Sequence, residues 1–172
     1  MYEIRYCNSI VKQGIMKKFR KPKGLNLFEH ACNCNSLEDI IAISYLFCPD
    51  FIQIGEYIFV SVFFEEEGEE AIKKVEKLEE RFGKNKKLIE QWVNSWSIGD
   101  LFINCTDESY QNNSLIMQFC DILVYNWQQR LKELFPHKKI IVETGNEIMG
   151  ELGLTITVQM GLRGLTDEAY RL

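Results

Sequence analysis

One continuous stretch decides the fold, and from Ser114 to Gln159 it reads SLIMQFCDILVYNWQQRLKELFPHKKIIVETGNEIMGELGLTITVQ. Its first half repeats apolar residues at steps of three and four, which is the spacing of one face of an α-helix. The predicted face consists of Leu115, Ile116, Phe119, Leu123, Trp127, Leu131 and Leu134. Phe135 and Pro136 end this pattern, because proline cannot continue a helix. We therefore predict one long helix over residues 114–134.

Two strands are predicted after this helix. Ile140 and Val142 share one face of the first strand. In the second, Leu154, Ile156 and Val158 alternate with Thr155, Thr157 and Gln159. Strict alternation is typical of a strand, and a glycine-rich loop of about nine residues, 145–153, joins the two. The long helix must bury its apolar face, and the hairpin formed by these strands is its natural partner.

A second hairpin is predicted earlier in the chain. Phe51–Ile54 and Tyr57–Phe64 flank the dipeptide Gly55-Glu56, which suits a two-residue type II′ turn. Both faces of the second strand are apolar, so we expect it to be covered on both sides.

Three further helices complete the pattern. Ser36 and Asp39 have the spacing of a capping box, and Ile40, Ile41, Ile43 and Leu46 follow. A helix opening at Glu65–Glu70 is predicted to bury Ile72, Val75, Leu78 and Phe82. The next helix, residues 86–96, is predicted to turn Leu88, Ile89, Trp92, Val93 and Trp96 inward. Core packing is the expected role of Trp92, Trp96 and Trp127, although an exposed tryptophan would make a good interface anchor.

These elements predict an α+β fold with a single domain. Two antiparallel β-hairpins, expected to join in one sheet, would pack against about five helices. The predicted division is a basic, partly disordered leader at residues 1–24 and the α+β domain at residues 25–172.

Charge is distributed unevenly along the 172 residues. The net charge is −5, yet residues 1–24 hold seven basic residues and one acid, Glu3, so the leader is +6 and the remainder −11. The basic residues of the leader are Arg5, Lys12, Lys17, Lys18, Arg20, Lys21 and Lys23. The leader is either a solvated arm or a contact with an acidic partner or RNA. The acidic body argues against general nucleic-acid binding, which needs a cationic face.

The chain has six cysteines: Cys7, Cys32, Cys34, Cys48, Cys105 and Cys120. The N-terminal residues lack the apolar run of a signal peptide, and no stretch reaches the roughly 18 apolar residues of a membrane span. Cys48 and Cys120 lie in apolar helical patterns, where a free thiol acts as a small hydrophobe. We expect a reduced, cytoplasmic protein without a membrane partner.

Two groups of residues have suitable chemistry but not the spacing that the chemistry needs. His30, Cys32 and Cys34 are of the types that bind zinc, yet zinc sites space their cysteines by two to four residues and use a second pair. A cysteine nucleophile needs a base beside it, and nothing in the sequence places His30 or His137 next to Cys48. We expect no metal, no cofactor and no nucleophilic cysteine.

The expected function is binding rather than catalysis. The sequence contains no G-x-x-x-x-G-K-[ST], G-x-G-x-x-G, H-E-x-x-H or G-x-S-x-G motif. A small acidic α+β body of this kind is similar to the bacterial immunity-type proteins that neutralise a toxin by binding it. The alternative is a small cytosolic enzyme that uses Glu143, Glu147, Glu151 or His137 near the second hairpin loop.

The predicted binding surface for a basic protein partner is an acidic cluster. Glu65, Glu66, Glu67, Glu69 and Glu70 place five carboxylates within six residues. Acids stabilise a helix N-terminus through its dipole, but two or three would suffice for that. The excess favours a negative patch that would steer a basic partner towards it. The sequence leaves the oligomeric state open.

Overall fold

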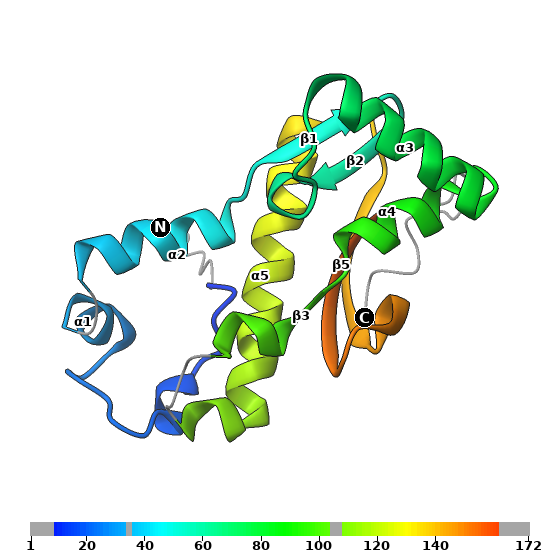
Figure 1. Cartoon of the computed structure of the whole chain (residues 1–172). Coiled ribbons are helices and arrows are strands. Elements are labelled where there is room, and N and C mark those ends of the chain that lie inside the picture. Colours follow the sequence, from blue (N-terminus) through cyan, green and yellow to red (C-terminus); the bar gives the residue numbers. More distant parts are fainter. Residues whose placement is uncertain (1–8, 34–35, 104–107, 162–172) are drawn as a thin grey trace, which may run out of the picture.

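The computed structural model describes residues 9–33, 36–103 and 108–161 (Figure 1). Within these ranges the α+β fold is confirmed, with five α-helices and two small antiparallel sheets. The helices are α1 (Leu27–Cys32), α2 (Leu37–Phe47), α3 (Gly68–Phe82), α4 (Lys86–Asn94) and α5 (Asn113–Leu134). The strands are β1 (Phe51–Ile54), β2 (Tyr57–Val60), β3 (Trp96–Ser97), β4 (Ile140–Asn146) and β5 (Leu154–Met160). None of the described helices is both long enough and apolar enough to cross a membrane.

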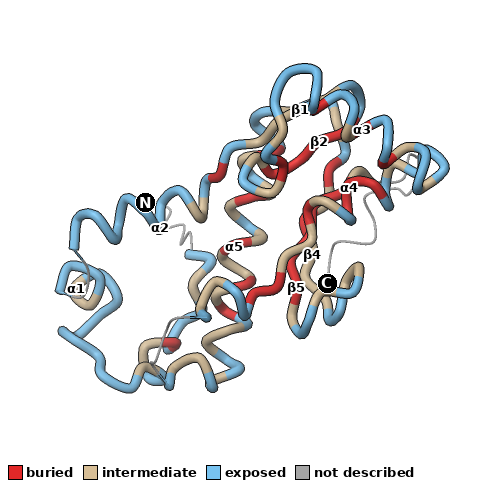
Figure 2. Tube along the Cα trace, in the orientation of Figure 1, coloured by how far each residue is buried: buried red, intermediate tan, exposed pale blue. Residues whose placement is uncertain are grey.

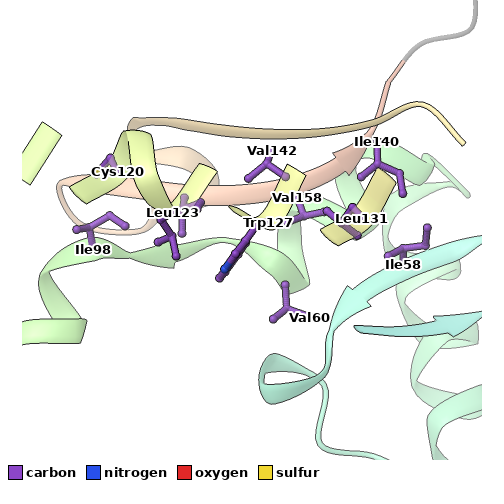
Figure 3. Close-up of a cluster of buried hydrophobic side chains, with 11 residues drawn as sticks. Ile58, Val60, Ile98, Cys120, Leu123, Trp127, Leu131, Ile140, Val142 and Val158 are labelled. Carbon is purple, nitrogen blue, oxygen red and sulfur yellow. The ribbon is translucent and has the colours of Figure 1, made fainter. Parts of the chain in front are cut away.

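Helix α5 runs through the middle of the molecule, as Figure 1 shows. Asn112 caps its N-terminus and Phe135 follows its last turn, so the predicted bounds are confirmed within one residue. Leu123, Trp127 and Leu131 are fully buried against β4 and β5. The largest core lies at this contact, and Figure 3 shows Trp127 pointing from α5 into its centre. Leu134, at the end of the predicted face, is 39% exposed.

The first hairpin separates two cores. Strand β2 pairs with β1 in the register Ile54↔Tyr57, and Gly55 turns the chain with φ of +58°, the sign that the first position of a type II′ turn needs. All four residues of β2 are buried, which confirms that it is covered on both faces. Ile58 and Val60 face α5, whereas Tyr57 and Phe59 join α3 and α4 in a second core. The predicted strand is shorter than expected, because Ser61–Phe63 form a 3-10 turn.

The two hairpins do not join, so the expectation of a single sheet is wrong. Strands β1 and β2 form one sheet, and a second has the order β3-β5-β4. Two polar side chains of α4 take the place of a backbone ladder between β2 and β5. Glu90 accepts hydrogen bonds from the N–H groups of Ile58 and Met160, at 3.0 and 2.6 Å. Asn94 donates to the carbonyls of Ile58 and Val158, both at 2.9 Å.

Three amide side chains on helices bind the backbone in the same way, each accepting from one N–H group and donating to the carbonyl two residues before it. Asn94 accepts from Val60 N–H while donating to the carbonyl two residues earlier, as a neighbouring strand would. Gln128 on α5 does the same at Ile140 and Val142, at 2.8 and 3.0 Å, along the outer edge of β4. Gln118 does so at Ile10 and Lys12, at 3.4 and 2.8 Å. At β2 and β4, helix side chains therefore satisfy edge groups that a second chain would otherwise pair with.

Three predicted apolar faces differ from the structure. Val75 and Leu78 of α3 are buried as predicted, but Ile72 is 54% exposed and Ala71 takes its place in the buried face. Trp92 is 41% exposed, because α4 turns Glu90 and Asn94 inward. The apolar residues of α2 are mostly exposed, although Ser36 and Asp39 form the predicted capping box. Figure 2 shows the buried residues concentrated in β2, β5, α4 and α5, with α1 and α2 exposed.

The predicted leader, residues 1–24, is described from residue 9 onward. Ile15 is buried in a short 3-10 turn, Ile15–Lys18, that contacts α5. Lys12 forms an ion pair with Asp121 of α5 at 2.8 Å. The division between a leader and the domain at residues 25–172 stays a prediction, and Arg5, Cys7, Cys34 and Cys105 lie outside the described residues.

Candidate interaction site

The acidic cluster lies on the segment that links β2 to α3. Phe64 anchors this segment, because its ring is buried and stacks on Phe59 with centroids 4.7 Å apart. Lys74 lies over the Phe64 ring at 4.5 Å and bonds to Glu66 at 2.5 Å. The hydrogen bond from Lys74 lowers the pKa of the Glu66 carboxyl below its ordinary value. One of the five carboxylates is thus bound back onto the helix.

The five predicted carboxylates divide into two groups. Glu66 and Glu70 are in ion pairs, the latter with Lys73 at 2.7 Å. Within the described ranges, Glu65, Glu67 and Glu69 are exposed and form no ion pair. Glu67 is the N-cap residue of α3, yet its side chain caps no N–H group. These three carboxylates therefore keep their charge available to a partner.

Exposed apolar side chains accompany these acids. Val62 in the turn before the cluster is 55% exposed, and Ile72, one helical turn after Glu69, is 54% exposed. We name Glu65, Glu67, Glu69 and Ile72 the acidic cap. Carboxylates beside an apolar surface suit lysine and arginine side chains, which have an apolar stem and a charged head.

A groove of about 590 Å³ continues from Ile72 between the β1–β2 turn and α3. Glu56, Glu76 and Glu79 line it, with apolar walls that include Ile54 and Val75. Two lysines also line the groove, Lys84 in an ion pair with Glu79 at 3.7 Å and Lys86 in one with Glu56 at 3.8 Å. The Tyr57 hydroxyl donates to Glu79 at 2.8 Å. Burial and the bond to Glu79 raise the pKa of Tyr57 to about 12, so this hydroxyl keeps its proton at neutral pH.

The alternative catalytic residues do not share a cavity among those described below. Glu143 on β4 accepts a hydrogen bond from Gln159 at 2.6 Å, and Glu147 is exposed in the turn after β4. His137 precedes β4, so the seven residues of that strand separate it from Glu147 by roughly 20 Å. Glu151 is half-buried in the loop. None of the four lines the 590 Å³ groove, nor the cavities of 520 and 420 Å³ beside α5.

The sulfur and histidine residues have other surroundings. His30 accepts from the Lys23 N–H at 2.9 Å through Nδ1 and packs on Phe19 at 4.9 Å. Cys32 and Cys48 are exposed thiols. Burial raises the pKa of the Cys120 thiol to about 11, which keeps it protonated. No group of three metal-ligating side chains occurs among the residues that the structure describes.

Sequence reasoning missed the polar residues that organise the structure. Glu90 and Asn94 are fully buried, and so are Thr155 and Thr157 on β5. The available signal was spacing: Glu90 and Asn94 are four residues apart and share a helix face with apolar Ile89 beside it. Burial raises the pKa of the Glu90 carboxyl, opposed by the N–H donors of Met160 and Ile58.

No family model matches this chain, and neither the curated proteins nor the solved structures that were searched include a match. The acidic cap and its groove are therefore the features of this molecule that point to a function.

Proposed function

We propose that the protein is a non-catalytic binding module, an immunity-type inhibitor that neutralises a basic toxin or effector by covering its cationic surface. One observation carries the proposal: three exposed carboxylates of the acidic cap, Glu65, Glu67 and Glu69, have no ion pair among the described residues. The Glu67 carboxylate is not engaged in capping α3, since its side chain forms no cap hydrogen bond.

The neighbouring groove gives the proposed contact its shape. A basic side chain of the partner would lay its stem on Ile72 and Val75 and direct its charge at Glu76. Electrostatic attraction at such a surface acts mainly on the rate of association and on the choice of partner. A toxin that acts on phosphates needs a cationic surface, and an acidic inhibitor would occupy it.

We expect the triple variant Glu65→Gln, Glu67→Gln, Glu69→Gln to associate with its toxin roughly tenfold or more slowly at low salt, because steering by opposite charge is lost. The toxin to test is the product of a neighbouring gene that encodes a secreted or toxin-domain protein. Stopped-flow association at low and high salt measures both the rate and its salt dependence.

The matched control removes three negative charges elsewhere, with Asp100→Asn, Glu147→Gln and Glu151→Gln. Asp100 lies in the 3-10 helix Ile98–Phe102, and Glu147 and Glu151 lie in the β4–β5 loop, outside the acidic cap. The control should therefore associate almost as fast as the wild type. An unchanged rate and salt dependence in the acidic-cap variant would show that the cluster only begins a helix. Equal losses in both variants would indicate net charge rather than a site.

A further inference from the structure

The basic leader and α5 border a cavity of about 420 Å³, together with α1 and the turn before α5. The leader is fixed there, because Gln118 of α5, which is 4% exposed, accepts a hydrogen bond from the Lys12 N–H at 2.8 Å, and Ile15 is buried. Phe19 packs on the His30 ring of α1 with centroids 4.9 Å apart. Figure 1 shows the leader, in blue, beside the start of α5. We name this space the leader cavity.

The walls of the leader cavity are mostly apolar. They consist of buried Ile15 and of the half-buried side chains of Phe19, Leu115, Phe119 and Ile122. Gln118 also lines the cavity, but its amide is already bonded to the backbone of Ile10 and Lys12. The inner wall therefore suits an aliphatic or aromatic body better than a polar one, since polar edges would lose their water without gaining partners.

The charged side chains that line the leader cavity are basic. Arg20 and Lys21 are exposed there, and the described lining residues include no acid. Lys21 forms no ion pair with a described residue. Arg20 forms an exposed ion pair with Glu108, a residue that lines the neighbouring 520 Å³ cavity. A guanidinium has five N–H donors, so Arg20 can bind a second anion while it keeps Glu108.

We propose that the leader cavity binds a small amphipathic anion, in which a carboxylate, sulfonate or phosphate group is attached to an apolar body. The head group would contact Arg20 and Lys21, and the body would lie against Phe119 and Ile122. The volume of the cavity lies within the range of about 300–1,000 Å³ that is usual for small-molecule sites. This binding is independent of the proposed toxin inhibition, because no residue of the acidic cap lines the cavity.

Two fluorescent probes separate the contributions of charge and of the apolar body. One is 8-anilinonaphthalene-1-sulfonate, and the other is N-phenyl-1-naphthylamine, which has the same rings without the sulfonate. Titration of the full chain should show one site per chain for the sulfonate, with a dissociation constant in the micromolar range. The neutral probe should bind about tenfold more weakly, because it makes no charge-assisted hydrogen bonds. Absence of saturable sulfonate binding, or equal affinity for the two probes, would overturn the proposal.

Removing the charge should affect only the anionic probe. The variant Arg20→Gln with Lys21→Gln should bind the sulfonate about tenfold more weakly and the neutral probe as the wild type does, which also shows that the cavity is intact. The matched control, Lys77→Gln with Lys132→Gln, removes two positive charges from α3 and α5 outside the cavity and should change neither affinity. Equal losses in the two variants would attribute sulfonate binding to net charge and contradict the site.

Filling the cavity should affect both probes. Ile122→Trp should weaken each at least tenfold, because the larger ring occupies the space of the apolar body. Leu134→Trp makes a similar change on the same helix, at a residue that is 39% exposed and lines none of the cavities described, and it should bind like the wild type. Circular dichroism of both variants checks that the fold is retained. Probe binding that survives Ile122→Trp would contradict the assigned cavity.

Competition identifies the head group. Both 1-naphthoate and 1-naphthyl phosphate should displace the sulfonate probe, and the stronger competitor shows whether the site prefers a carboxylate or a phosphate. Inorganic phosphate at the same concentration should not displace it, because it has no apolar body. Displacement by inorganic phosphate would show that the basic residues bind anions without the cavity, and it would overturn the proposal.

Discussion

Replacing Trp127 with alanine is expected to lower the free energy of unfolding by about 3–5 kcal/mol, the range for truncating a large buried aromatic side chain. Trp127 is 1% exposed and lies between α5, the β4–β5 sheet and the first hairpin, with an edge contact to Phe51 at 6.3 Å. Its loss also removes the hydrogen bond to Leu46, which ties α2 to the body. Urea denaturation followed by circular dichroism measures the change.

The matched control is Trp92→Ala. This tryptophan is 41% exposed and packs on Phe82 at 5.6 Å and under Arg81 at 4.0 Å. Its removal should cost clearly less, at about 1 kcal/mol, because no closed cavity forms and only a surface cation–π contact is lost. A loss below about 1 kcal/mol at Trp127, or equal losses at the two positions, would contradict the assigned core.

Replacing Glu90 with alanine is expected to destabilise the fold by roughly 2–5 kcal/mol. The buried N–H group of Ile58 and the half-buried N–H group of Met160 lose their acceptor, and an unsatisfied buried donor costs about 1–3 kcal/mol. The contact between β2 and β5 should loosen, since Glu90 bridges the two strands. Hydrogen exchange at those two amides would locate the change, with faster exchange there than in the α5 helix.

Glu90→Gln separates the roles of shape and charge. Glutamine keeps one carbonyl acceptor but points an NH2 donor at the second backbone N–H, so we expect a smaller loss than with alanine. A Glu90→Ala variant as stable as the wild type would show that the bridge is dispensable.

The difference in unfolding free energy between the wild type and the Glu90→Gln variant should depend on pH with a definite sign. Burial raises the folded-state pKa of the Glu90 carboxyl above its ordinary value of 4.5, so the folded protein binds more protons than the unfolded chain between those two values. The contribution of Glu90 to stability therefore rises as the pH falls through the folded-state pKa, and it levels off below about 4.5. Glutamine does not titrate. Denaturation between pH 8 and pH 4.5 measures the unfolding free energy of the wild type minus that of Glu90→Gln. This difference should increase towards low pH, and an opposite trend would contradict a raised pKa.

Part of the candidate site was predictable from local sequence. Five clustered glutamates before an amphipathic pattern predict an acidic helix start, and α3 begins at Gly68 within that cluster. Which carboxylates stay unpaired was not predictable. That depends on Lys74 reaching Glu66 across the Phe64 ring, a contact that requires the chain to turn at Ser61–Phe63. The groove beside Ile72 likewise exists only where α3 meets the first hairpin.

The sequence by itself determined the elements whose signals are local. Periodicity, caps and turn residues specify α5, the capping box at Ser36 and the Gly55 turn, because neighbours along the chain make those interactions. Only the tertiary structure decided that the hairpins stay apart. Glu90 and Asn94 look like ordinary polar residues of a surface helix, and they become buried bridges only when β2 and β5 present unpaired backbone groups to them. Long-range hydrogen bonds of this kind leave no periodic pattern in the sequence. Which face of α4 is buried, and that the apolar residues of α2 stay exposed, is therefore decided only when the whole chain is packed.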